Sequence, residues 1–131
     1  MTENFKEYLE QINFDTYLKK LNKKLKGKSI ILYGKGSFLK YIKTNYDLSS
    51  LNIIGISDMK ISEEDTFVLG YKAIVKNEIM DHSPDVILIA TKKYLKHLNH
   101  FHLKLRKTSK TRVYPLAKVP FFTIAKEILT K

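Results

Sequence analysis

The chain contains no cysteine, which excludes disulfide bridges and thiolate metal sites. Its longest uninterrupted apolar run is far shorter than the roughly 18–20 residues that a membrane-spanning helix needs. The N-terminal sequence MTENFKEYLEQ is acidic and amphipathic, and it lacks the basic-then-apolar order of a secretion signal. From these absences we expect a cytoplasmic protein without a membrane span.

Arginine is scarce, although the formal net charge is +11. The arginines are Arg106 and Arg112, and the remaining positive charge is lysine spread over most of the expected helices and strands. Arginine is the usual reader of base edges and the usual bidentate partner of phosphate. The composition therefore argues against a specific nucleic-acid partner, while it still predicts a surface that attracts anionic ligands.

Motifs of several common catalytic sites are also missing. The sequence has no Walker A loop, no G-x-S-x-G elbow and no side chain that is recognisable as an activated nucleophile. His97, His100 and His102 are close in sequence, but on a helix only the first two share a face. Because no carboxylate or cysteine near them completes a ligand set, no metal site is predicted, and the catalytic residues, if any, are unknown.

The sequence does contain short apolar runs that alternate with amphipathic segments over its 131 residues. Two helices are expected within residues 3–26. Beyond them the pattern predicts strands at residues 29–33, 52–57, 70–75, 85–91 and 111–116, and helices at 37–46, 76–82, 92–107 and 121–130. Alternation of this kind predicts an α/β fold, a Rossmann-like doubly wound parallel sheet of about five strands. We expect an N-terminal helical segment, residues 1–27, followed by that domain, residues 28–131.

The end of the first expected strand carries the clearest candidate binding site. Gly34 would permit a tight turn, and Gly36 would let a phosphate approach backbone N–H groups at the start of a helix. Lys35 adds a cation, and Ser37 lies in the first turn of that helix. Leu39 occupies the position of the third glycine in the dinucleotide pattern G-x-G-x-x-G. An ordinary strand-to-helix turn without a ligand is the alternative interpretation of the two glycines.

Two further segments are expected at the same edge of the sheet. Asp58 ends the second strand about twenty residues after the glycines, where an acid can accept hydrogen bonds from a ribose. Its alternative role is a strand-end cap or turn former. Thr91 and Lys92 follow the strand at 85–91 and could hold a second phosphate or a sugar; for Thr91 the alternative is an ordinary helix N-cap.

The segments IILYGKGSFLKYI, NIIGISD, LGYKAI and PDVILIAT, in this order, are similar to a known family. They resemble the Rossmann-like nucleotide-binding domains of bacterial surface-polysaccharide and sugar-nucleotide biosynthesis proteins, including the N-terminal domain of sialic-acid- and bacillosamine-type sugar acyltransferases. The resemblance covers about residues 28–94. It implies that Gly34, Gly36 and Asp58 line a nucleotide or sugar-nucleotide site. The hexapeptide-repeat β-helix that carries catalysis in those acyltransferases has no counterpart in the sequence, so a binding module is expected rather than a complete transferase.

The leading functional hypothesis is therefore a nucleotide- or sugar-nucleotide-binding domain in surface-glycan biosynthesis. A UDP-sugar is the first choice of ligand, with NAD and CoA as alternatives. The second hypothesis is an interaction module without a ligand, in which the N-terminal helices form a homodimer. The third is a small NAD-dependent oxidoreductase-like domain, which is disfavoured because hydride transfer requires a substrate placed against the nicotinamide.

Overall fold

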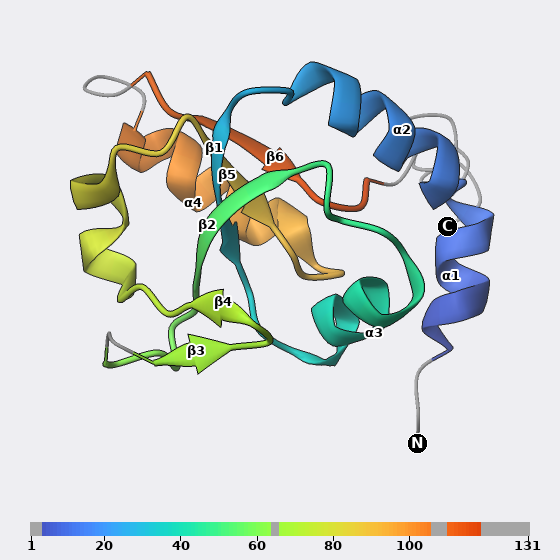
Figure 1. Ribbon diagram of the computed structural model, residues 1–131, viewed down its shortest axis with the longest axis horizontal. Coiled ribbons are helices and arrows are strands. Elements are labelled where there is room, and N and C mark those ends of the chain that lie inside the picture. Colours follow the sequence, from blue (N-terminus) through green and yellow to red (C-terminus); the bar gives the residue numbers. More distant parts are fainter. Residues whose placement is uncertain (1–3, 64–65, 106–109, 119–131) are drawn as a thin grey trace.

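A four-stranded parallel sheet forms the centre of the molecule (Figure 1). The computed structural model describes residues 4–63, 66–105 and 110–118. The strand order is β2-β1-β5-β6, and each neighbouring pair is parallel. The strands are β1 (Ser29–Tyr33), β2 (Asn52–Ser57), β5 (Val86–Ile89) and β6 (Arg112–Pro115). The first two have the predicted bounds, and the other two lie within the predicted segments.

Helices occupy most of the predicted helical segments. They are α1 (Phe5–Gln11), α2 (Phe14–Lys24), α3 (Ser37–Asn45), the 3-10 helix η1 (Lys76–His82) and α4 (Tyr94–Leu105). In the described part of the chain, no helix is both long enough and apolar enough to cross a membrane. The helix predicted at residues 121–130 lies outside the described residues.

The segment predicted as a further strand, residues 70–75, is mostly not part of the sheet. β3 (Phe67–Val68) and β4 (Tyr71–Lys72) instead form an antiparallel two-stranded hairpin. The chain reverses between them through Leu69 and Gly70, whose φ angles are 51° and 85°. Because the turn directs β4 back against β3, β4 pairs there rather than as a full strand beside β2.

One short contact remains where the strand at residues 70–75 was expected to join the sheet. Ala73 forms an isolated parallel bridge with Ile56 of β2, and the Ile74 N–H donates to the Ile56 carbonyl at 2.8 Å. The described sheet is therefore four strands wide, with a single bridge at the outer edge of β2.

Helices cover both faces of the sheet. Along β1, Ile30 and Leu32 belong to one buried cluster, and Ile31 and Tyr33 belong to another on the opposite face. The first cluster is completed by α1, α2 and α3, whose buried residues include Leu9, Leu18 and Leu39, and the second by residues of η1 and α4 such as Ile79 and Phe101. Coverage on both faces explains why these strands read as continuous apolar runs instead of alternating ones.

The N-terminal helices share their core with the sheet. Leu9 of α1 and Phe14 of α2 lie in the same buried cluster as Ile30 and Leu32 of β1. The most buried apolar side chains of α1 and α2 therefore pack in the core of this chain.

The strand order determines where the connections meet. The connection after β1 leads to β2 on one side, and the connection after the neighbouring strand β5 leads to β6 on the other side, so these two connections run in opposite directions. In open α/β sheets, ligands bind beyond the carboxyl ends of the strands at such a reversal. Here that position lies between the turn after β1 and the turn after β5.

Candidate functional site

Gly34 forms the inner part of the turn after β1. Its φ angle is 116°, a conformation that side chains disfavour, and its N–H donates to the Ser57 carbonyl at 2.8 Å. A Cβ atom at this position would lie 2.7 Å from Cγ2 of Thr91 and 3.3 Å from the Ala90 backbone. A glycine is therefore needed here for the tight turn and for close contact with the chain after β5.

Gly36 and Ser37 form the outer part of the same turn. Gly36 is the N-cap of α3, with φ −75° and no side-chain hydrogen bond to the helix. It is exposed, and a Cβ atom placed on it would meet no atom of the described residues within 4 Å. The first N–H groups of a helix have no acceptor inside the helix, so those at the start of α3 are left to water or to a ligand.

Leu39, which replaces the third glycine of the dinucleotide pattern, does not obstruct this space. It is fully buried in the cluster that α3 shares with α1, α2 and the sheet. Its side chain packs beneath the helix, while the N-cap remains open.

Asp58 lies beside the turn, as the sequence predicted, and it fixes the backbone there. One carboxylate oxygen accepts the Lys35 N–H at 3.0 Å, and the other accepts the Lys60 N–H at 2.9 Å. Its own carbonyl accepts the Ile61 N–H at 3.0 Å. Asp58 therefore has the turn-forming role that was the alternative to ribose binding, and it occupies the Lys35 N–H.

Thr91 is in direct contact with the turn after β1 through the close approach to Gly34. It does not have its alternative role as a helix N-cap, because α4 begins at Tyr94. Its Oγ1 is buried and has no hydrogen-bond partner within the described residues. The hydroxyl is thus placed beside the glycine turn with unused hydrogen-bonding capacity.

The Lys92 side chain contacts α1. Its Nζ lies 4.4 Å from the ring centroid of Tyr8, a distance typical of a cation–π contact. The structure therefore brings together Gly34, Lys35, Asp58 and Thr91, whereas the Lys92 ammonium is at the α1 side of the site.

Two buried hydroxyls at the same sheet edge were not predicted as members of the site. Tyr33 and Ser57 end β1 and β2, are register partners and are 2% and 0% exposed. In the described part of the chain, neither hydroxyl has a hydrogen-bond partner. Burial, and to a lesser extent the Asp58 charge, raise the pKa of Tyr33, so its phenol is protonated at neutral pH. The only feature of the sequence that could have indicated these two hydroxyls is the polar residue at the end of each apolar strand.

Two basic side chains contact Tyr33 on that face. His97 of α4 meets its ring edge-on at 5.4 Å between centroids, and the Lys76 Nζ lies 5.5 Å from the ring centroid. Burial foremost, with the Lys76 and Lys96 cations, lowers the pKa of His97, which is therefore neutral at pH 7. No group of three or more histidine, aspartate or glutamate side chains suited to a metal ion occurs among the described residues.

The arrangement can bind an anion with backbone N–H groups at the start of α3 and with nearby hydroxyls. It shows no nucleophile paired with a base in the described residues. No protein-family model matches the chain, and no curated protein matches it either.

Proposed function

We propose that this protein is a small Rossmann-like domain that binds a nucleotide or sugar nucleotide, with a UDP-sugar as the first choice of ligand. The observation that carries the proposal is the open N-cap of α3 at Gly36, next to the point where the connections after β1 and β5 run in opposite directions. The resemblance of residues 28–94 to surface-polysaccharide biosynthesis domains supports a cytoplasmic role in surface-glycan biosynthesis.

The phosphate would bind at the outer part of the turn. Uncapped N–H groups and the positive end of the α3 dipole both favour an anion there. The net charge of +11 adds a general attraction for anionic ligands. The Lys35 N–H contributes nothing to this binding because Asp58 already accepts it.

Asp58 retains a possible second role in this proposal. Each carboxylate oxygen accepts one backbone N–H, and a carboxylate oxygen can accept more than one hydrogen bond. A ribose or sugar hydroxyl could therefore donate to it without displacing the turn. A negative charge at this place disfavours a ligand with a 2′-phosphate.

The second candidate is an interaction module without a ligand. The observation that favours it is the structural use of both Asp58 oxygens, which accounts for this residue without any nucleotide. The two candidates differ in one respect, since only the first gives the open Gly36 N-cap a ligand.

A thermal-shift titration with a UDP-sugar, UMP, NAD and CoA tests the proposal. A ligand that binds only the folded state stabilises it, by about 2.7 kcal/mol at one hundred times its Kd. We expect a rise in Tm of several degrees with at least one uridine nucleotide. If none of the four compounds changes Tm at millimolar concentration, nucleotide binding is rejected and the interaction module is favoured.

Two variants of Gly36 make the test specific to the site. Gly36→Asn and Gly36→Asp both supply an N-cap side chain in open space, but only aspartate adds a negative charge. Gly36→Asp is expected to lose the ligand-induced shift. Gly36→Asn is expected to lose less of it, because its amide is neutral. Equal ligand responses in wild type and Gly36→Asp would place the phosphate elsewhere.

A further inference from the structure

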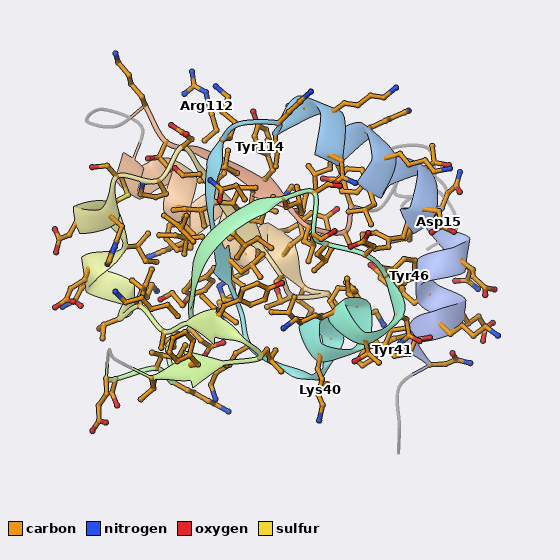
Figure 2. All side chains as sticks on the ribbon, viewed as in Figure 1. Asp15, Lys40, Tyr41, Tyr46, Arg112 and Tyr114 are labelled. Atoms are coloured by element: carbon orange, nitrogen blue, oxygen red, sulfur yellow. The ribbon has the colours of Figure 1, made fainter. Side chains whose placement is uncertain are left out.

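A groove runs between α1 and α3 and begins at the candidate phosphate site. Its volume is about 420 Å³, within the range of small-molecule pockets. Ser37, the first residue of α3, lines it together with Phe5 of α1 and Tyr41 of α3. Tyr41 extends from α3 toward α1 (Figure 2), and its ring centroid is 5.9 Å from that of Phe5. The groove therefore has aromatic walls and shares a residue with the proposed site.

The groove follows one stripe of α3. Ser37, Tyr41 and Asn45 are spaced by one helical turn each and all line it. From the first to the last of them the helix rises about 12 Å. A ligand held at the start of α3 could therefore extend along this stripe without leaving the protein surface.

The charge of the groove matches an anionic ligand. Lys6 of α1 and Lys40 of α3 line it, and its described lining contains no aspartate or glutamate. Lys40 extends from α3 away from the sheet (Figure 2). An anionic compound with an aromatic part would meet attraction from these cations and stacking surface from the rings.

We infer that this groove holds the nucleobase of the ligand whose phosphate binds at Gly36 and Ser37. The inference rests on the proposed function and adds the position of the base and the residues that contact it. Base stacking on an aromatic side chain strengthens binding by about tenfold. Asn45 would contact the base edge: its amide N–H donates to the Tyr41 carbonyl at 2.9 Å, which leaves its side-chain oxygen as an acceptor.

The test compares UMP with ribose 5-phosphate, which has the phosphate and sugar but no base. We expect calorimetry to show that wild type binds UMP about tenfold more tightly or better. Tyr41→Leu, which keeps an apolar side chain and removes the ring, is expected to reduce that ratio to about one while leaving ribose 5-phosphate binding unchanged. Tyr46→Leu is the matched control, because Tyr46 lies outside the groove and contacts Phe14 instead; it should leave the ratio unchanged.

A second measurement needs no variant and does not depend on how Tyr41→Leu folds. In amide NMR spectra of wild type, UMP is expected to shift Gly36, Ser37, Tyr41 and Asn45, and ribose 5-phosphate only the first two. Equal affinities together with identical shift patterns would overturn the groove assignment and leave the phosphate site in place. If neither compound binds, the inference fails, whereas the proposed function is rejected only if the UDP-sugar, NAD and CoA also leave Tm unchanged. Concentration-dependent shifts at Tyr41 without ligand would assign the groove to a second copy of this chain, which also overturns the inference.

Discussion

The two glycines of the turn after β1 are in opposite surroundings, although one residue separates them. Gly34 is buried, has a φ angle of 116° and leaves no room for a Cβ atom. Gly36 is exposed, has a φ angle of −75° that any residue can adopt, and has open space where a Cβ would be. The fold thus explains why residue 34 is a glycine, whereas neither backbone conformation nor packing requires a glycine at residue 36.

The amides of the turn show the same difference. The Lys35 N–H is held by the Asp58 carboxylate at 3.0 Å, whereas Ser37 begins a helix that no side chain caps within the described part of the chain. The inner part of the turn is therefore closed by contacts within the chain, and the outer part is open to solvent. The proposed function therefore assigns the ligand to the outer part.

The largest effect is expected when the inner glycine is replaced. Gly34→Ala forces a disfavoured φ angle and a contact of 2.7 Å with Thr91, so it should lower the free energy of unfolding by about 2 kcal/mol or more. Urea denaturation measures this. Gly36→Ala is the control, with an expected loss below about 1 kcal/mol. If both variants lose the same stability, the two glycines do not differ as described.

A double variant separates the two causes. Thr91→Ser removes the Cγ2 atom that a Cβ at Gly34 would approach. In the Gly34→Ala background it should therefore restore part of the lost stability, and the two changes should be non-additive. Strict additivity would show that the clash contributes nothing and that backbone strain alone explains the loss.

The next effect concerns the acid that closes the turn. Asp58→Asn replaces one acceptor oxygen with a donor facing a backbone N–H, and hydrogen bonds to charged groups are worth about 1.5–3 kcal/mol. We expect a loss of about 1–3 kcal/mol in the free energy of unfolding. Asp47→Asn is the matched control, since Asp47 accepts the Ser49 N–H at 2.9 Å in an exposed turn, and it should cost less. A loss no larger than that of Asp47→Asn would deny Asp58 its structural role.

A gain in stability is expected at the outer glycine. Without ligand, Gly36→Asn should stabilise the protein by a few tenths of a kcal/mol, because asparagine caps a helix better than glycine. Gly36→Asp should add about 0.3–1 kcal/mol through the α3 dipole. Thermal denaturation without ligand measures both. Destabilisation by either variant would mean that the space above Gly36 is already filled.

The smallest effect is the pH dependence of stability that arises from His97. Because the pKa of His97 is lowered in the folded state, the unfolded state takes up this proton first as the pH falls. The folded state therefore loses stability as the pH falls below about 6.5, the unfolded value. His97→Gln should reduce the decrease in Tm between pH 7.5 and pH 5.5, and His100→Gln serves as the control. An unchanged pH profile in His97→Gln would contradict the assigned pKa direction.

Much of the fold follows from local sequence patterns. The runs SIILY and VILI give β1 and β5 because continuous β-branched and apolar residues suit strands that are buried on both faces. NIIGIS gives β2, of which only Gly55, Ile56 and Ser57 are buried. Since parallel strands present their carboxyl ends at one edge, Gly34, Asp58 and Thr91 were correctly expected together. Residues 70–75 do not form a full strand of the sheet, because the turn at Gly70 pairs Tyr71 and Lys72 with β3, a tertiary choice that β propensity does not reveal.

The details of the site depended on packing that the sequence does not specify. Asp58 can accept the Lys35 N–H only because the turns after β1 and β2 lie close together. The spacing of these residues along the chain does not predict how closely the two turns approach. The groove between α1 and α3 depends on how the N-terminal helix lies on the sheet, and only then do Phe5 and Tyr41 meet. Gly36 is the exception. A phosphate-binding turn requires an exposed glycine at this position, and the spacing of the two glycines in the sequence already suggested one.

Amide hydrogen exchange of residues 34–39, with and without a uridine nucleotide, tests the contrast between the two parts of the turn most directly. The account predicts that the Lys35 amide exchanges slowly in both states. The Ser37 and Phe38 amides should exchange rapidly in the free protein and slowly once the nucleotide is added. Slow exchange of Ser37 and Phe38 without nucleotide, or rapid exchange that the nucleotide does not change, would contradict it.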